Sequence, residues 1–256
     1  MTIIAVIPAR MGSSRYPGKP LADIHGLPMV GHVALRTALC PLLAAAYIAT
    51  CDQEIMDFAL SRGIPAVMTA DTHTRCTDRT AEALLGIERD LGRRADIVVM
   101  VQGDEPMVTP GMIEAAIAPL LEDPDLQVVN LMADLAGAAE FEDPNEVKVV
   151  TDLRGNALYF SREPIPSRKK GAAAVPMKKQ VCVIPFRRDY LLRYTSLPET
   201  PLEIIESVDM MRVLENGDTV RMVSIPERTL SVDTPEDIAR VAELMRNDPL
   251  RGLYGG

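Results

Sequence analysis

The stretch IIAVIPARMGSSRYPGKPL, residues 3–21, joins an apolar run to a short segment rich in glycine, serine and positive charge. The run Ile3–Ile7 has the composition of a strand that is buried on both faces. The glycines and serines that follow allow a tightly folded loop with exposed backbone N–H groups. Such N–H groups, together with Arg10 and Lys19, suit a polyanion such as a triphosphate. The stretch therefore predicts a buried strand followed by a phosphate-binding loop.

Two familiar phosphate-binding motifs do not match this loop. A Walker-type loop has four residues between its glycines, whereas five residues separate Gly12 from Gly18. It also places Ser or Thr directly after its lysine, and here Pro20 follows Lys19. The dinucleotide fingerprint G-x-G-x-x-G is absent from the loop as well. A solvated basic turn therefore stays open as the alternative.

The composition indicates a folded protein with an acidic charge balance. The 256 residues are 47% hydrophobic, which suffices for a sizeable core, and the formal net charge is −9. This charge argues against general binding to nucleic acids or membrane surfaces. Four scattered cysteines suit a reducing compartment, and we find no signal-like segment and no run of transmembrane length. We expect a cytoplasmic protein with no nucleic-acid or membrane partner.

The first half alternates strand and helix patterns, which is typical of a largely parallel sheet with crossover helices. We expect strands at 44–50, 64–69, 96–101 and 127–132, and helices at Pro28–Leu39, Gln53–Ser61, Pro110–Leu121 and from Thr77 onward. In open α/β folds, ligands bind at the carboxyl edge of the sheet. The basic loop and residues 102–106 should therefore face one crevice.

The pattern changes around Pro144. Residues 146–162 alternate apolar and polar side chains around Gly155, which predicts a hairpin. We then expect a basic loop at 167–179, a strand at 180–186, helices at Asp189–Tyr194 and 201–217, a strand at 219–225 and a final helix capped by Thr234. The sequence thus predicts one domain, 1–256, that carries a second subdomain at about 144–217.

Two aspartates at strand ends are the strongest candidates for chemistry. Asp104 follows a buried strand in VQGDEP, and Asp233 precedes the final helix in SVDTPED. Each is open to a plainer role as a turn or capping residue, although Thr234 is the better helix cap. Two carboxylates that face a phosphate-binding loop would form a Mg²⁺ site of the hard-oxygen type.

Seven motifs, in order, resemble those of the 3-deoxy-D-manno-octulosonate cytidylyltransferases: IPARMGSSRYPGKPL, VQGDEPM, NEVKVV, ALYFSREPIP, TPLE, RVLENG and VDTPED. The resemblance spans essentially the whole chain. It implies an α/β nucleotidyltransferase-type (Rossmann-like) fold, a mixed sheet flanked by helices, with the subdomain serving acceptor binding and dimerisation. It also implies a Mg²⁺-dependent homodimer that transfers CMP from CTP to a sugar acid, with release of pyrophosphate, for lipopolysaccharide assembly.

The loop pattern and the resemblance together assign roles to individual residues. The expected catalytic residues are Arg10, Lys19, Asp104 and Asp233, of which the two aspartates are the Mg²⁺ ligands. The expected nucleotide-binding residues are Arg10, Ser13, Ser14, Arg15, Lys19, Thr77 and Gln102. The expected acceptor-binding residues are Arg162, Gln180, Glu203 and Glu206.

Four positions depart from the family pattern, and we interpret them as affecting the acceptor. Arg75 and Cys76 stand where Ser and Gly are usual. Gln180 and Ile184 stand where a histidine and a tyrosine are usual, and they cannot reproduce the hydrogen bonds of those side chains. The lysines at 169, 170, 178 and 179 either meet an anionic acceptor or form a solvated charged face.

Three hypotheses about function follow. The first is a cytidylyltransferase that acts on 3-deoxy-D-manno-octulosonate or a close relative of it. The second keeps this chemistry but takes another small anionic acceptor. The third is a nucleotide-binding protein without catalysis, against which the presence of Lys19, Asp104 and Asp233 argues.

Overall fold

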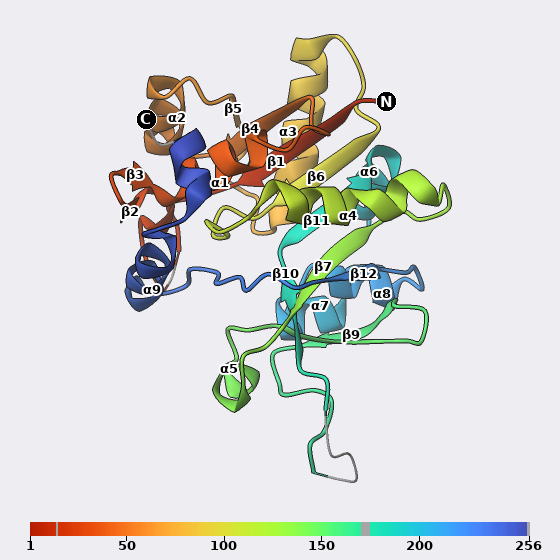
Figure 1. Cartoon of the computed structure of the whole chain (residues 1–256). Helices are drawn as coiled ribbons and strands as arrows, with labels where there is room; N and C mark the ends of the chain where they lie inside the picture. The colour runs from red at the N-terminus through yellow and green to blue at the C-terminus, as the bar shows by residue number, and fades with distance from the viewer. Residues whose placement is uncertain (14, 170–174, 255–256) are drawn as a thin grey trace. The chain divides into compact units, whose positions relative to one another are not determined.

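The computed structural model of the chain describes residues 1–13, 15–169 and 175–254 (Figure 1). The chain forms two compact units. The first contains Met1–Glu114 and Thr229–Gly256, and the second contains Ala115–Arg228. The subdomain expected at about 144–217 lies inside the second unit, which extends further in both directions. Its roles in acceptor binding and dimerisation stay predictions.

The first unit is built on parallel strands in the order β6-β1-β4-β5. These are β1 (Ile3–Pro8), β4 (Ala45–Thr50), β5 (Ala66–Met68) and β6 (Ile97–Val101), connected through α1 (Met29–Ala38), α2 (Gln53–Ser61) and α3 (Cys76–Leu91). Every residue of β1 is buried, as the apolar run predicts. Because β1 and β6 are parallel neighbours, the segments that follow them leave from the same edge of the sheet.

The C-terminal part of the chain completes the core of the first unit. Its remaining elements are η1 (Lys19–Leu21), β2 (Asp23–Ile24), β3 (Leu27–Pro28), α9 (Pro235–Met245) and η2 (Pro249–Leu253), and α4 (Pro110–Glu122) contains the boundary with the second unit. Ile24, Met29, Val232, Val241 and Met245 form one buried cluster, and α9 lies beside the β2-β3 hairpin (Figure 1). This packing carries Asp233 back to the loop after β1.

The second unit contains a mixed sheet in the order β12-β7-β10-β8-β9. Its strands are β7 (Val129–Asp134), β8 (Lys148–Thr151), β9 (Ala157–Ser161), β10 (Lys178–Val181) and β12 (Arg221–Ile225), of which only β12 and β7 pair in parallel in this sheet. It also contains α5 (Ala138–Glu142), β11 (Val183–Arg187), α6 (Arg188–Thr195), α7 (Pro201–Glu206) and α8 (Met210–Glu215). The predicted hairpin is β8-β9. Among the described residues, no helix has both the length and the apolar character needed to span a membrane.

Two predicted elements are each divided in the structure. The strand expected at 180–186 is split between β10 and β11, with Cys182 between them. The helix expected at 201–217 is α7 followed by α8, because Ser207 has a left-handed backbone with a φ of 52°. The break lets the end of α8 turn back toward α7.

A buried ion pair joins α7 to α8. The Arg212 guanidinium donates to both carboxylate oxygens of Glu203, each at 2.7 Å, and the two side chains are 2% and 0% exposed. Glu203 also takes part in the capping box with Thr200 at the start of α7. The prediction that Glu203 binds an acceptor is therefore wrong, since this glutamate is enclosed and holds the helix pair together.

Replacing Glu203 by alanine should destabilise the protein strongly. The Arg212 guanidinium would stay buried without its counter-ion, and the removal of one partner of a buried pair costs about 3–5 kcal/mol. We expect a loss of this size in the free energy of unfolding, measured by urea denaturation. The exposed Glu227 lies in the same unit, and Glu227→Ala should change that free energy by less than about 0.5 kcal/mol. Equal effects of the two substitutions would contradict the structural role of Glu203.

Candidate active site

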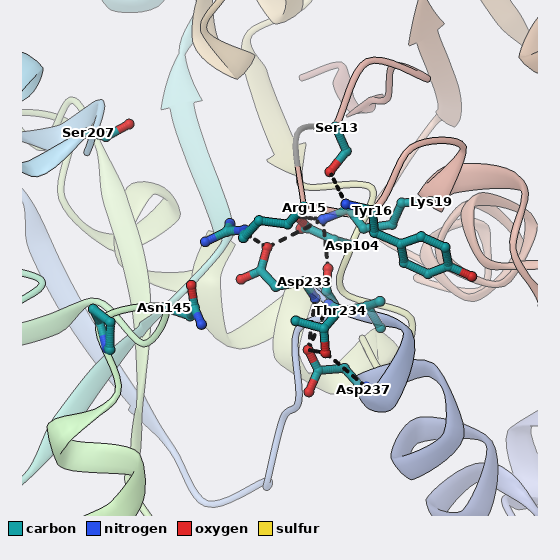
Figure 2. Close-up of polar contacts among 12 residues, drawn as sticks. Ser13, Arg15, Tyr16, Lys19, Asp104, Asn145, Ser207, Asp233, Thr234 and Asp237 are labelled. Atoms are coloured by element: carbon teal, nitrogen blue, oxygen red, sulfur yellow. Dashed lines mark hydrogen bonds and ion pairs between the residues drawn. The ribbon is translucent and has the colours of Figure 1, made fainter.

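Lys19 lies between the carboxylates of Asp104 and Asp233 in the first unit (Figure 2). Its Nζ is 2.9 Å from Oδ2 of Asp104 and 3.6 Å from Oδ1 of Asp233. The same nitrogen donates to the Val232 carbonyl at 2.6 Å. Arg15 donates to Oδ1 of Asp233 at 2.7 Å. The loop after β1 thus brings two cations onto the two predicted metal ligands.

Asp104 reaches this position because β6 continues directly along the end of β1. The Gly103 N–H donates to the Pro8 carbonyl at 3.3 Å. A Cβ atom on residue 103 would lie 2.9 Å from that carbonyl oxygen, so only glycine allows this approach. The Asp104 carbonyl in turn accepts a hydrogen bond from the Val232 N–H at 2.9 Å. One backbone hydrogen bond therefore joins the segment of Asp104 to the segment of Asp233.

The carboxylate of Asp233 does not cap the helix that follows it. Thr234 is the N-cap of α9, and its side chain accepts a hydrogen bond from the Asp237 N–H. The Asp237 carboxylate accepts in return from the N–H groups of Asp233 and Thr234, at 3.1 and 2.9 Å. The prediction that Thr234 caps the final helix is confirmed. The Asp233 side chain instead faces Lys19 and Arg15 (Figure 2).

The loop that carries Lys19 is folded around the Met11 backbone. The Met11 carbonyl accepts hydrogen bonds from the N–H groups of Ser13 and Gly18, at 2.9 and 3.1 Å. The Met11 N–H donates to the Asp52 carboxylate at 2.7 Å, and the Ser13 hydroxyl accepts from the Tyr16 N–H at 3.3 Å. The loop is thus held by its own bonds and by Asp52, and the plainer interpretation as a solvated turn does not describe Lys19, whose side chain is 12% exposed. Ser14 lies outside the described residues.

The charge state of Lys19 follows from its surroundings. Burial opposes its charged form, but the charge and hydrogen bond of Asp104 and the charge of Asp233 outweigh burial and raise its pKa above the ordinary lysine value. Lys19 therefore stays protonated at neutral pH. In this state its ammonium group neutralises the carboxylate pair from within.

The residues present fit a divalent cation that is shared with a ligand. Oxygens of Asp104, Asp233 and the Val232 carbonyl converge on one point, which the Lys19 ammonium occupies. Mg²⁺ commonly binds through one or two carboxylates together with phosphate oxygens. Within the part of the chain that the structure describes, no group of three or more His, Cys, Asp or Glu side chains could hold a metal. The pair would therefore depend on a ligand for its further oxygens.

A pocket lies beside the first part of the loop. It is lined by Pro8, Ala9, Arg10, His73, Thr74, Arg75, Cys76 and Arg79. Arg79 is 2% exposed and donates to the carbonyls of Ala70 and His73, so it shapes the wall of the pocket. Arg75 and Cys76 thus lie next to Arg10, a predicted nucleotide contact. Our interpretation that these two departures concern the acceptor stays a prediction.

The other two predicted nucleotide contacts, Gln102 and Thr77, differ in how accessible they are. Gln102 is half-buried in the segment directly after β6, one residue before Gly103. Thr77 is completely buried in the first turn of α3 and is not among the residues that line the pocket. Thr74 and Arg79 line this pocket and lie in the same HTRCTDR motif as Thr77, but neither was predicted as a site residue.

In the second unit, Arg162 and Glu206 join the end of β9 to the end of α7. The Arg162 guanidinium donates to the carbonyls of Glu206 and Pro144, at 2.7 and 2.8 Å. The Glu206 carboxylate accepts from the Arg162 N–H at 2.9 Å and from the hydroxyls of Ser161 and Tyr159, at 3.0 and 3.2 Å. Both side chains thus have structural partners within the unit. Their predicted contacts with an acceptor stay predictions.

The side chain of Gln180 has a fixed orientation. Its Nε2 donates to Oδ1 of Asn130 at 2.6 Å, and Asn130 is completely buried. The Asn130 amide group donates in turn to the Val181 carbonyl at 2.7 Å. Ile184, by contrast, is only 1% exposed and belongs to the core, so its departure from the family pattern affects packing. The predicted contact of Gln180 with an acceptor stays a prediction.

Two lysines of the basic segment have acidic partners. Lys178 is 2.7 Å from Asp134, and Lys179 is 3.0 Å from Glu146 in a pair that is almost completely buried. Burial raises the pKa of the Glu146 carboxyl, although Lys179 opposes this shift. The interpretation as a solvated charged face is therefore wrong for Lys179. Lys170 lies outside the described residues.

Comparisons with known proteins assign the chain to a family. The family model described as cytidylyltransferase matches residues 4–225. The chain belongs to the cytidylyltransferase family. The expected family and the α/β fold class are thus confirmed.

Relatives of this cytidylyltransferase match it over nearly the whole chain. The 3-deoxy-manno-octulosonate cytidylyltransferase of Syntrophotalea carbinolica is 44% identical over 254 residues, which cover 96% of this chain and 99% of the relative. That of Solibacter usitatus is 42% identical, covering 99% and 98%. A solved CMP:2-keto-3-deoxy-manno-octonic acid synthetase complexed with CTP has a TM-score of 0.88 at 38% identity, and the match covers 97% of this chain and 100% of that one.

Removing the Lys19 ammonium should open the carboxylate pair to a metal ion. We expect Lys19→Met, without nucleotide, to bind Mn²⁺ at least about tenfold more tightly than the original protein, because the cation that contacts both Asp104 and Asp233 is gone and only the exposed Arg15 still meets Asp233. Titration of the free Mn²⁺ signal by electron paramagnetic resonance measures this affinity. Lys169→Met, at an exposed lysine of the second unit, is the control and should have no effect. Equal affinities of Lys19→Met and the original protein would show that Lys19 does not occupy the metal position.

Proposed function

We propose that this chain transfers CMP from CTP to 3-deoxy-manno-octulosonate and releases pyrophosphate. Two relatives named for this sugar acid match nearly the full chain at 42–44% identity, and the solved synthetase at 38% identity holds CTP. The observation that carries the proposal is the convergence of Lys19, Asp104 and Asp233 at the carboxyl edge of the sheet. Cations for phosphates and carboxylates for a metal lie together there.

The proposed reaction is a displacement at the α-phosphorus of CTP. The acceptor hydroxyl oxygen forms a bond to this phosphorus, and its proton passes to solvent water. The bond from the α-phosphorus to the oxygen that bridges to the β-phosphorus breaks, and pyrophosphate leaves with the electron pair. No protein nucleophile takes part. Arg10 and Lys19 would neutralise the charge that develops on the phosphate oxygens.

We further propose Mg²⁺ as the cofactor, held by Asp104 and Asp233. The support is the convergence of hard oxygen donors on the position of the Lys19 ammonium. When bound, the metal would supply Lewis-acid stabilisation of the phosphate oxygens. For this, Lys19 must leave the carboxylates and meet the phosphates of CTP instead.

The second candidate is transfer of CMP to a different small anionic acceptor. It is favoured by Gln180, whose amide is held by Asn130 at a position where the family pattern has a histidine. A site that hydrogen-bonds a substrate hydroxyl discriminates strongly against molecules that leave its polar groups unpaired. A glutamine in place of the histidine at position 180 would therefore change which acid the site accepts.

We also propose that the protein is a cytoplasmic homodimer formed through its second unit. Leu158, Ile204 and Ile205 are 61%, 57% and 72% exposed there, and a second copy would cover apolar side chains of this kind. The four cysteines are free thiols, which suits a reducing compartment. The net charge of −9 supports the absence of nucleic-acid and membrane partners.

Exchanging either carboxylate for its amide should stop catalysis without unfolding the protein. We expect Asp104→Asn and Asp233→Asn each to lower the turnover of CTP with 3-deoxy-manno-octulosonate by at least about 10²-fold, because an anionic metal ligand is lost. Pyrophosphate release at saturating Mg²⁺ measures the rate. Asp125→Asn, at an exposed aspartate of the second unit, is the control and should leave the rate unchanged. Near-normal turnover in either active-site variant would overturn the assignment of both ligands.

The acceptor is tested with a panel of acids and the variant Gln180→Ala. Pyrophosphate should be released with CTP but far more slowly with ATP or GTP, and 3-deoxy-manno-octulosonate should be the best of the sugar acids tested. Gln180→Ala should raise the KM of the acceptor about tenfold and leave the KM of CTP unchanged, because only the acceptor loses a hydrogen-bond partner. Gln127→Ala serves as the control, since the Gln127 amide donates to the nearby Asp125 carbonyl. Efficient transfer to this sugar that Gln180→Ala does not alter would show that position 180 is neutral.

A further inference from the structure

Arg36 on α1 is a buried cation that holds the far end of the segment carrying Asp104. Its side chain is 2% exposed. Its Nε donates to the Val108 carbonyl at 2.6 Å, and its Nη2 donates to the Met107 carbonyl at 3.3 Å. These two carbonyls end the segment 102–108 that follows β6. One guanidinium thus fixes two successive peptide groups of this segment.

The same guanidinium also holds the segment that follows Asp233. Its Nη1 forms an ion pair with Asp248, which lies three residues beyond the end of α9, at Met245. The Asp248 carboxylate is itself held, since its Oδ1 accepts from the Leu250 N–H at 2.9 Å. Two segments bring the carboxylates together: residues 102–108, which contain Asp104, and residues 232–248, which contain Asp233 and α9. Arg36 binds the C-terminal end of each of them.

Near their N-terminal ends, the two segments are joined by one hydrogen bond. The Val232 N–H donates to the Asp104 carbonyl at 2.9 Å. Among the described residues, the polar contacts of Arg36 are with Met107, Val108, Asp248 and Tyr254, so it acts on the two aspartates through the backbone. Movement at residues 107–108 or at Asp248 would therefore tilt the two segments about the crossing at Val232 and change the separation of the carboxylates that extend from them.

The chemistry of arginine suits this role better than a purely stabilising one. A buried ion pair contributes little net stability compared with well-packed apolar side chains of similar volume. The planar guanidinium, however, donates in several fixed directions at once, which the single charged group of lysine cannot do. It thereby fixes the orientation of two carbonyls and one carboxylate together.

We infer that Arg36, with Asp248 as its counter-ion, is a positioning residue that sets the separation of the Asp104 and Asp233 carboxylates. The inference rests on the proposed role of these two carboxylates in metal binding. A displacement of about 1 Å in a site that orients reacting groups can cost about 10²-fold in rate. Loss of the Arg36 contacts should therefore act on metal binding and turnover more than on the binding of CTP.

The test compares Arg36→Lys, Arg36→Met and Asp248→Asn with a matched arginine in the second unit. Arg187 donates to the carbonyls of Leu120, Asp123 and Leu126, so Arg187→Lys removes similar bonds within the second unit. We measure Mn²⁺ affinity in the presence of CTP, kcat and the KM of CTP, and the folded fraction by circular dichroism at the assay temperature. Arg36→Lys should stay folded, weaken Mn²⁺ binding about tenfold and lower kcat about 10²-fold, with little change in the KM of CTP. Arg187→Lys should leave Mn²⁺ affinity and kcat unchanged.

Several outcomes would overturn the inference. Arg36→Lys with the original Mn²⁺ affinity and kcat is one, and a loss of activity that only follows the unfolded fraction is another. If both Arg36 variants fail to fold, Asp248→Asn decides, because its side chain is partly accessible at 16% exposure and the variant leaves the carbonyl bonds of Arg36 in place. Original Mn²⁺ binding in that variant would then refute the inference. Failure of the proposed function would be distinguished from failure of this inference. In that case the unaltered protein would release no pyrophosphate, and the Mn²⁺ affinities of the variants could still be compared.

Discussion

The ammonium group of Lys19, held between Asp104 and Asp233, is the interaction on which the arrangement of the first unit depends. The three residues come from the loop after β1, the segment after β6 and the segment before α9, which are widely separated in the sequence. Two carboxylates this close would repel each other if no cation lay between them. The internal cation therefore allows the site to exist before any ligand arrives. A triphosphate and a metal would replace attractive contacts that are already present in the folded protein.

This arrangement explains why the first unit is discontinuous in sequence. Residues 115–228 form the second unit, and the chain then returns to place Val232, Asp233 and α9 against the N-terminal part. The apolar side chains of Val232, Val241 and Met245 supply the burial that fixes this return. The polar residues Lys19, Asp104 and Asp233 are thus positioned by packed apolar side chains, as is usual in a preformed binding site.

Local patterns in the sequence predicted the elements of the first unit well. The helix at Gln53–Ser61 was predicted with its observed bounds, and the cap at Thr234 followed from the preference for threonine before a helix. Asp104 was found because turn residues after buried strands of an α/β fold gather at one edge, whereas Asp233 was found from its place before the final helix, where Thr234 is the better cap.

Roles that depend on a distant partner could not be predicted in the same way. Glu203 fits the family motif, but Arg212 encloses it only because Ser207 adopts a left-handed backbone. The orientation of Gln180 depends on Asn130, fifty residues earlier in the chain. Thr77 was assigned to the nucleotide from its place in a motif, and the periodicity of α3 could not show which face of its first turn is buried. Tertiary contacts decide these cases, and no local pattern records them.

The hydrogen bond between Val232 and Asp104 joins main-chain groups only, and this has an evolutionary consequence. Its geometry does not depend on the side chain at residue 232, so that position is free to vary among apolar residues that fill the same space. Proline alone would remove the donor. Mutational drift in a lineage of such enzymes should therefore spare the crossing of the two segments itself. Selection would act instead at Gly103, where the Pro8 carbonyl leaves no room for a methyl group.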